Sequence, residues 1–221
     1  MNIEFYQALI QSLSRTHTKL IAVSKTRSND ALMEAYQLGI RAFGENKVQE
    51  LVAKQEALPK DIEWHLIGHL QSNKVKYIAP FIYLIHSIDS LSLLEEVNKQ
   101  AEKNNRIIRC LLQCHIAKEE TKYGFSAASL ETVLSNGTLT AFKHIELCGL
   151  MGMATNTDDA MLIEQEFASL QQLFLAIKSN YFSAQDSFKE LSMGMSGDYE
   201  MAIKHGSTMV RIGSSLFGER S

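Results

Sequence analysis

Apolar residues gather in short runs that are spaced along the whole chain, with more polar stretches between them. Each run has the length and the apolar content of a strand buried in a protein core. The eight runs cover residues 20–25, 42–46, 64–68, 84–89, 109–115, 146–153, 190–195 and 209–217. This pattern predicts a chain built on eight strands.

The stretches between the runs carry apolar residues at helical spacing, such as Leu91, Leu94 and Val97 with charged residues between them. Strands that alternate with helices predict parallel strands joined by right-handed crossovers. A doubly wound open sheet is the usual alternative. Eight units in 221 residues, without a change of composition that marks a second domain, favour a closed barrel. We therefore predict an α/β fold, one (β/α)8 TIM barrel over residues 1–221, with an extra N-terminal helix over 1–15.

Composition narrows the range of partners. The chain has 22 basic and 25 acidic residues, a net charge of −3 and no long run of one sign, so we expect neither nucleic acid nor an anionic membrane as partner. No signal peptide and no bilayer-spanning stretch is expected. The cysteines, Cys110, Cys114 and Cys148, are odd in number and form no C-x-x-C pair, which favours free thiols in a cytoplasmic protein.

A lysine ends the first apolar run, "LIAVSKT". Lys25 shares parity with Ile21 and Val23, so it faces the same side as they do, which is the barrel interior. Working side chains of such barrels lie at the C-terminal ends of the strands. A partly desolvated lysine there keeps more of its neutral amine, which attacks aldehydes to form a Schiff base. The alternative is a strand-end lysine that reaches solvent.

Two turns rich in glycine and serine follow the last two runs, "SMGMSGD" at 192–198 and "RIGSS" at 211–215. Loops after the seventh and eighth strands of a barrel often bind phosphate through backbone N–H groups and hydroxyls. Arg211 shares parity with Met209 and Gly213, and a guanidinium aimed inward needs a partner. A lysine, a phosphate cradle and an inward arginine together indicate pyridoxal 5′-phosphate.

The sequence resembles the pyridoxal phosphate homeostasis protein family, whose barrel is similar to the N-terminal domain of alanine racemase. The resemblance spans nearly the whole chain. It rests on "AVSKT" (22–26), "FGEN" (43–46), "VQE" (48–50), "WHLIGHLQSNK" (64–74), "HSIDS" (86–90), "EETKYGF" (119–125), "GLMGMAT" (149–155), "LSMGMSGD" (191–198) and "GSTMVRIGSSLFG" (206–218). It implies one barrel that holds the cofactor on the lysine of the first strand, without established turnover.

Residue by residue, the resemblance makes Lys25 the Schiff-base lysine. Ser192, Gly213 and Ser214 become phosphate contacts, and Arg211 becomes the partner of the pyridine nitrogen.

The resemblance also places Asn46 at the end of the second strand, lining the pocket near the cofactor ring. Lys122 matches a second family lysine that would serve cofactor transfer, with an exposed loop lysine as the alternative. Lys47 stands where many relatives have a tyrosine, which puts any role of that aromatic ring in doubt.

His65 and His69 have the spacing of a helical zinc motif, but Leu66 follows His65 where H-E-x-x-H needs glutamate, and "WHLIG" reads as a strand. We expect no metal site.

Three functions fit this chemistry. The first, which we favour, is a monomeric, non-enzymatic pyridoxal phosphate carrier that acts in cofactor homeostasis and passes the cofactor to apoenzymes. The second is an amino-acid racemase-like enzyme, which needs acid–base groups on both faces of the substrate α-carbon. We expect no second domain to supply the opposite face. The third is a cofactor-free Schiff-base aldolase, which would be colourless where the other two would be yellow.

Overall fold

The parallel strands close into a barrel in the order β1-β2-β3-β4-β5-β6-β7-β8, and β8 pairs with β1. This computed structural model describes residues 1–117 and 123–218. The strands are β1 (Lys19–Val23), β2 (Ala42–Glu45), β3 (Glu63–Leu66), β4 (Leu84–Ile88), β5 (Ile108–Gln113), β6 (Ile145–Met151), β7 (Glu190–Ser192) and β8 (Met209–Ile212). The predicted (β/α)8 barrel is confirmed.

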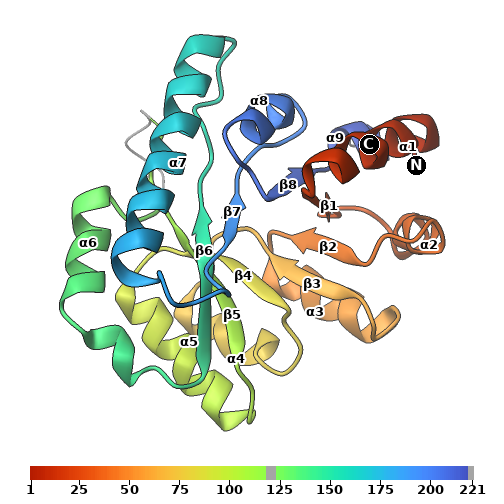
Figure 1. The fold of residues 1–221 in the computed structure, drawn as a ribbon. Coiled ribbons are helices and arrows are strands. Elements are labelled where there is room, and N and C mark those ends of the chain that lie inside the picture. Colours follow the sequence, from red (N-terminus) through yellow and green to blue (C-terminus); the bar gives the residue numbers. More distant parts are fainter. Residues whose placement is uncertain (118–122, 219–221) are drawn as a thin grey trace.

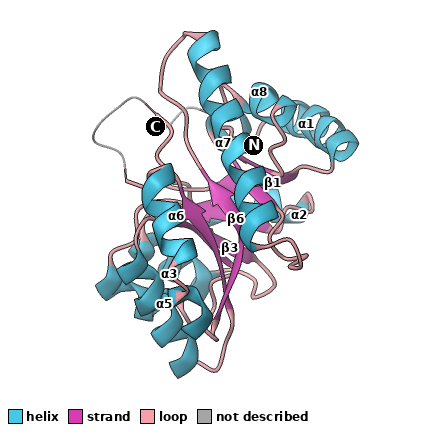
Figure 2. Ribbon diagram, turned by 60° about the vertical axis from the view of Figure 1, so that its left-hand side comes forward, coloured by secondary structure: helices cyan, strands magenta, loops and turns pink. Residues whose placement is uncertain are grey.

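Helices surround the barrel on its outer side, as Figure 2 shows. They are α1 (Ile3–Thr16), α2 (Asn29–Gln37), α3 (Val48–Ala57), α4 (Val75–Ile78), α5 (Leu91–Lys103), α6 (Ala127–Ser135), α7 (Ala160–Tyr181), α8 (Tyr199–Lys204) and α9 (Ser214–Phe217), with 3₁₀ turns η1 (Ser72–Lys74) and η2 (Thr138–Ala141). The extra N-terminal helix is α1, as predicted.

The last apolar run was expected to be strand from 209 to 217, and this is wrong in its second half. β8 ends at Ile212, and residues 214–217 form the short helix α9. Gly213 and the two serines after it end the strand, because they favour a turn over a pleated, half-buried surface. The backbone N–H of Asn2 donates to the Leu216 carbonyl at 2.8 Å, which ties α9 to α1 beside the chain ends (Figure 1).

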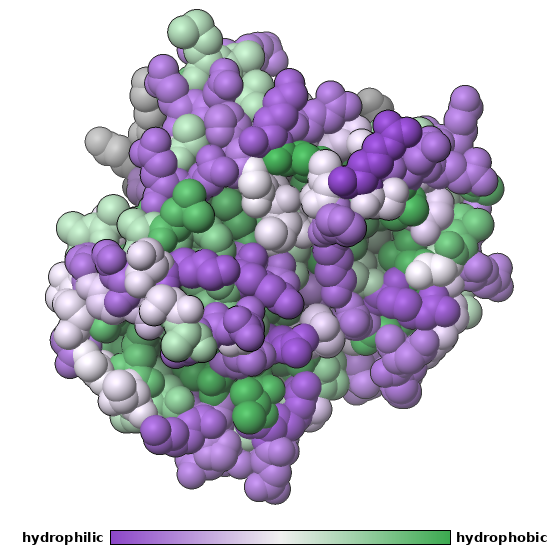
Figure 3. Space-filling view, in the orientation of Figure 1, coloured by the Kyte–Doolittle hydropathy of each residue, from purple (hydrophilic) through white to green (hydrophobic). Residues whose placement is uncertain are grey.

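Apolar side chains fill two regions. The larger core lies between the barrel wall and the helices and contains Phe43, Trp64, Phe167 and Phe188 among its fully buried members. A smaller cluster fills part of the barrel interior, formed by Ile21, Ala42, Leu84, Leu111, Cys148, Met151 and Met209. Polar side chains cover most of the face seen in Figure 3, with apolar side chains between them.

The three cysteines are free, as predicted, and all three are buried. Burial raises the pKa of the Cys114 and Cys148 thiols to about 12, so both stay protonated near neutrality. In the part of the chain that the structure describes, no cluster of acidic, histidine and cysteine side chains is arranged to hold a metal ion. Within the same residues, no helix combines the length and the apolar character that crossing a bilayer requires.

Gly149 marks an irregularity of the barrel wall between β5 and β6. The register shifts there, and Gly149 pairs with Leu111 on one side and Glu190 on the other. Its φ is +150°, and a Cβ at this position would lie 1.8 Å from the Glu190 carbonyl oxygen. The close approach of β6 and β7 therefore requires glycine.

We expect Gly149→Ala to lower the free energy of unfolding by about 3 kcal/mol or more, because β6 and β7 must separate to admit the methyl group. Gly137→Ala is the matched control: its φ is also positive, +73°, but a Cβ there meets nothing within 4 Å. Gly137→Ala should lower the free energy of unfolding by only about 1–2 kcal/mol. Urea unfolding measures both variants, and an equal loss would contradict the packing argument.

Candidate functional site

A cavity of about 270 Å³ opens where β1, β2 and β8 end, and we call it the site cavity. Four of its lining residues are apolar, and the other seven supply an amine, a guanidinium, an amide, two hydroxyls and glycine backbone. The residues are Val23, Ile67, Met153 and Met195, and Lys25, Asn46, Ser196, Gly197, Arg211, Gly213 and Ser214. The carboxyl ends of barrel strands are where ligands of such folds bind.

Lys25 lies two residues beyond the end of β1 and is half-buried. Val23, the last residue of the strand, lines the site cavity with it, which agrees with the parity argument made from the sequence. Asn46 follows the end of β2 directly. The structure therefore brings Lys25 and Asn46 together on the cavity wall.

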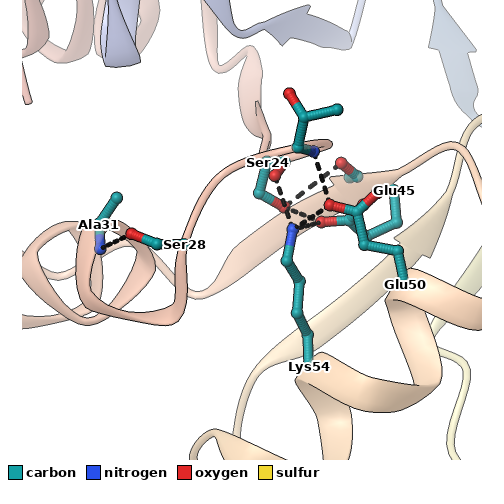
Figure 4. Close-up of polar contacts among 8 residues, drawn as sticks. Ser24, Ser28, Ala31, Glu45, Glu50 and Lys54 are labelled. Atoms are coloured by element: carbon teal, nitrogen blue, oxygen red, sulfur yellow. Dashed lines mark hydrogen bonds and ion pairs between the residues drawn. The ribbon is translucent and has the colours of Figure 1, made fainter. Parts of the chain in front are cut away.

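The turn that carries Lys25 is held from both sides by an ion-pair network, shown in Figure 4. The Lys54 ammonium, on α3, donates to Glu45 Oε1, to Glu50 Oε1 and to the Ser24 carbonyl, each at 2.7 Å. The Ser24 hydroxyl donates to Glu45 Oε1 at 2.6 Å, and the Thr26 backbone N–H donates to Glu50 Oε1 at 2.5 Å. These five residues form the clamp.

The clamp explains how a strained turn can persist beside the site cavity. Thr26 has a φ of +65°, in the left-handed region that non-glycine residues rarely adopt. Glu45 and Lys54 are buried. Burial raises the pKa of Glu45, whereas the hydrogen bonds from Lys54 and Ser24 act to lower it. The clamp was not predicted from the sequence, although Glu50 and Lys54 stand four residues apart on one helix face.

Arg211 forms part of the floor of the site cavity and is buried. Its Nη1 donates to Ser192 Oγ at 2.6 Å, and its Nη2 donates to the Gly152 carbonyl at 3.0 Å. Burial lowers the pKa of the guanidinium to about 10, with Asp198 acting in the opposite direction. Arg211 therefore stays positively charged at neutral pH.

The two glycine- and serine-rich turns meet at the same cavity. Ser196 and Gly197 come from the loop after β7, and Gly213 and Ser214 follow β8. Among the described residues, the backbone N–H groups of Ser196, Gly197 and Ser214 have no acceptor. A Cβ on Gly197 would meet nothing within 4 Å, so space remains beside this backbone. Unpaired donors that converge on one space form a concavity suited to an anion.

Ser192 does not lie where the sequence placed it. Its side chain is fully buried and does not line the site cavity; it accepts from Arg211 and contacts His86 Nδ1 at 2.9 Å. The strand parity gives the reason, because Ser192 still belongs to β7 and faces the barrel interior, whereas Ser196 stands in the loop above it. The hydroxyl of this turn that lines the cavity is that of Ser196.

Two interior histidines complete the surroundings of Arg211. His65 Nδ1 lies 2.9 Å from His86 Nε2, and both rings are fully buried. From the sequence, the spacing of His65 and His69 was considered and rejected as a zinc motif, and His86 was not identified as a site residue. Strand parity could have identified both. His65 faces the same side as Ile67, which follows β3, and His86 faces the same side as Leu84 on β4; both sides are the barrel interior.

His69 and the other lysines lie elsewhere. His69 Nδ1 contacts Asp89 Oδ2 at 3.0 Å, and its ring stacks on Tyr123. Lys47 is exposed and precedes α3, outside the cavity lining. Lys122 lies outside the described residues. Asp198 stands at the N-cap position of α8, but its carboxylate accepts from the Met195 backbone N–H and makes no capping bond to the helix.

The fold and the site define a class of protein: a (β/α)8 barrel with a lysine and an anion cradle at the carboxyl ends of its strands. The family model "Alanine racemase, N-terminal domain" matches residues 3–221. The pyridoxal phosphate homeostasis protein of Aquifex aeolicus is 40% identical over 203 residues, 91% of this chain and 87% of that protein. The one from Helicobacter pylori strain 26695 is 41% identical, covering 93% of this chain and 90% of that protein. The chain belongs to the pyridoxal phosphate homeostasis protein family.

Solved structures agree with this assignment. PipY of Synechococcus elongatus, solved with pyridoxal phosphate bound, superposes with a TM-score of 0.87 at 36% identity, covering 97% of this chain and 99% of that one. An alanine racemase of Clostridium difficile has a TM-score of 0.77 at 14% identity, and this chain covers 56% of it. The similarity to this alanine racemase shows a shared fold only.

The clamp should contribute to the stability of the fold. We expect Lys54→Met to lower the free energy of unfolding at pH 7 by about 3–5 kcal/mol, because it leaves Glu45 as a buried charge without a cation. Glu45→Gln together with Lys54→Met should recover most of this loss. Lys99→Met, at an exposed lysine 3.8 Å from Glu96, is the control and should change stability by less than about 1 kcal/mol.

The loss in Lys54→Met should also depend on pH. Without Lys54, the pKa of Glu45 in the folded protein lies further above its value in the unfolded chain. The penalty is therefore absent at a pH below the unfolded pKa, where Glu45 is protonated in both states, and it grows as pH rises to the folded pKa. The penalty should therefore shrink as pH is lowered. Urea unfolding of the cofactor-free protein at several pH values measures it. A Lys54→Met loss no larger than that of Lys99→Met would contradict the clamp.

Proposed function

We propose that this chain binds pyridoxal 5′-phosphate in the site cavity and acts in the homeostasis of that cofactor as a reversible, non-enzymatic carrier. The observation that carries the proposal is the convergence of Lys25 and the unpaired backbone N–H groups of Ser196, Gly197 and Ser214 on one cavity. The names of the relatives and the pyridoxal phosphate bound in the PipY structure support it. Residues 1–221 would form one cofactor-binding barrel.

The donor set fits the phosphate group. Backbone N–H groups and the hydroxyls of Ser196 and Ser214 offer neutral donors, which hold a dianion without fixing it by a full counter-charge. Gly213 brings the strand ends close together, because a Cβ there would lie 3.0 Å from the Val23 carbonyl oxygen. We assign the phosphate to Ser196, Gly197, Gly213 and Ser214. Ser192 then acts on the site through Arg211.

The remaining polar residues fit the other two groups of the cofactor. When bound, pyridoxal 5′-phosphate supplies an aldehyde that a neutral amine bonds reversibly and a ring that withdraws electrons most strongly when its nitrogen is protonated. Lys25 is the amine. Arg211 would face the ring nitrogen and disfavour its protonation, because two positive charges would be adjacent. Asn46 would contact the ring edge.

A carrier fits the ionisable groups better than a racemase does. Among the described residues that line the site cavity, Lys25 and Arg211 are the ionisable ones, and Arg211 keeps its proton at neutral pH. Racemisation needs a proton donor or acceptor on each face of the α-carbon, each worth about 10²–10⁴-fold in rate. One lysine serves one face. The monomeric state, the transfer to apoenzymes and the cytoplasmic location stay predictions.

We expect Lys25→Ala to lose the visible absorption band that the purified protein shows with pyridoxal phosphate. Borohydride reduction of the wild type, followed by peptide mapping, should place the pyridoxyl group on Lys25. Lys47→Ala is the matched control and should keep the band, since Lys47 does not line the cavity. A label found on Lys47 or Lys122 and absent from Lys25 would refute the assignment. A colourless protein that cleaves sugar phosphates would favour the aldolase instead.

We also expect that the protein loaded with cofactor does not racemise L-alanine faster than free pyridoxal phosphate does. Chiral chromatography of L-alanine incubated with the loaded protein measures this, with Lys25→Ala alongside. Saturable formation of D-alanine that depends on Lys25 would overturn the carrier and establish a racemase.

A further inference from the structure

Four buried polar side chains form a line across the barrel interior beneath the site cavity. Arg211 on β8 donates to Ser192 on β7 at 2.6 Å, Ser192 Oγ lies 2.9 Å from His86 Nδ1 on β4, and His86 Nε2 lies 2.9 Å from His65 Nδ1 on β3. All four side chains are more than nine-tenths buried. The line starts at a residue of the site cavity and ends deep in the barrel.

The donors and acceptors along this line run in one direction. Arg211 can only donate, so Ser192 Oγ accepts from it. The Ser192 proton then needs an acceptor, and in the described chain His86 Nδ1 is the one in reach. His86 must therefore carry its proton on Nε2 and donate to His65 Nδ1. His65 in turn carries its proton on Nε2, the nitrogen that has no partner among the described residues.

The line is neutral beyond Arg211. Burial holds the pKa of His65 and of His86 well below the ordinary value; the neighbouring His65, Arg211 and Lys19 add to this at His86, and Lys19 adds to it at His65. No carboxylate of the described residues forms an ion pair with Arg211; its two acceptors are a serine hydroxyl and the Gly152 carbonyl. The Asp198 carboxylate acts on the guanidinium from a distance but forms no ion pair with it, so Arg211 is held in place by neutral groups and lines the cavity as a cation.

We propose that His86 is a positioning residue that orients Arg211 through Ser192, by accepting the serine proton at Nδ1, and so sets how the cofactor ring is held. This inference rests on the proposed function. It assigns to a histidine outside the cavity lining a role in affinity and in the electronic state of the bound ring. A histidine that merely filled the barrel would have no such effect.

Two variants of the same size separate the roles. His86→Asn keeps an acceptor, its Oδ1, at the place of Nδ1, whereas His86→Leu removes it. We expect His86→Leu to bind pyridoxal phosphate roughly tenfold more weakly, about 1.4 kcal/mol, with a shifted absorption maximum of the bound cofactor. The dissociation constant of His86→Asn should stay within about twofold of the wild-type value, and its absorption maximum should not shift. This holds although the variant loses the hydrogen bond to His65.

Spectroscopic titration gives the dissociation constants, and urea unfolding of the cofactor-free variants gives their stability. Equal binding by both variants, whether both match wild type or both are weakened alike, overturns the proposal, because the acceptor at Nδ1 would then be irrelevant. If His86→Leu does not fold, Ser192→Ala replaces it: it removes the same link and should weaken binding at least as much, and unchanged binding refutes the proposal.

A measurement on the wild type without cofactor completes the test. Long-range ¹H–¹⁵N NMR of the histidine rings should show the Nε2–H tautomer for both His65 and His86. A proton on His86 Nδ1 would reverse the line and overturn the proposal. This result does not depend on cofactor binding. Wild-type protein that binds no pyridoxal phosphate would therefore refute the proposed function while leaving the tautomer result to decide the hydrogen-bond direction.

Discussion

The pairing of β1 with β8 is the contact on which the site depends. Lys19 to Ala22 lie in register with Met209 to Ile212, and this ladder joins the first strand of the barrel to the last. Lys25 and Gly213, which stand near opposite ends of the chain, thereby come to one cavity. An open sheet of the same strands would leave them at its two edges. The amine and the phosphate cradle therefore exist as one site only because the barrel closes.

Two networks support the site, and they differ in kind. The clamp is built of charges and holds the backbone on either side of Lys25, where the left-handed Thr26 needs support. The line that supports Arg211 consists of neutral side chains, Ser192, His86 and His65, and leaves the guanidinium charge available to the cavity. The clamp fixes the position of the lysine amine, and the neutral line keeps the arginine charge at the cavity where a phosphorylated ring would lie.

Much of the fold could be predicted from the sequence, because eight apolar runs alternating with helical patterns leave few topologies, and parity places Lys25 and Arg211 inward. Parity also shows why Ser192 was misplaced: a strand residue and a loop residue of one turn look alike in sequence, and Ser196 is the one that lines the cavity. Glu45 and His86 were missed because their partners come from other strands and helices, and Lys54 was missed because the spacing of Glu50 and Lys54 on α3 does not show that Glu45 and the Ser24 carbonyl complete the network. Such contacts are set by packing and carry no local sequence pattern.

The most direct test of this account is a crystal structure of the protein with pyridoxal phosphate. We expect electron density continuous with Lys25 Nζ, the phosphate against residues 196–197 and 213–214, and the ring nitrogen facing Arg211. Density for the cofactor at another place, with the site cavity filled by solvent and Lys25 unmodified, would contradict it.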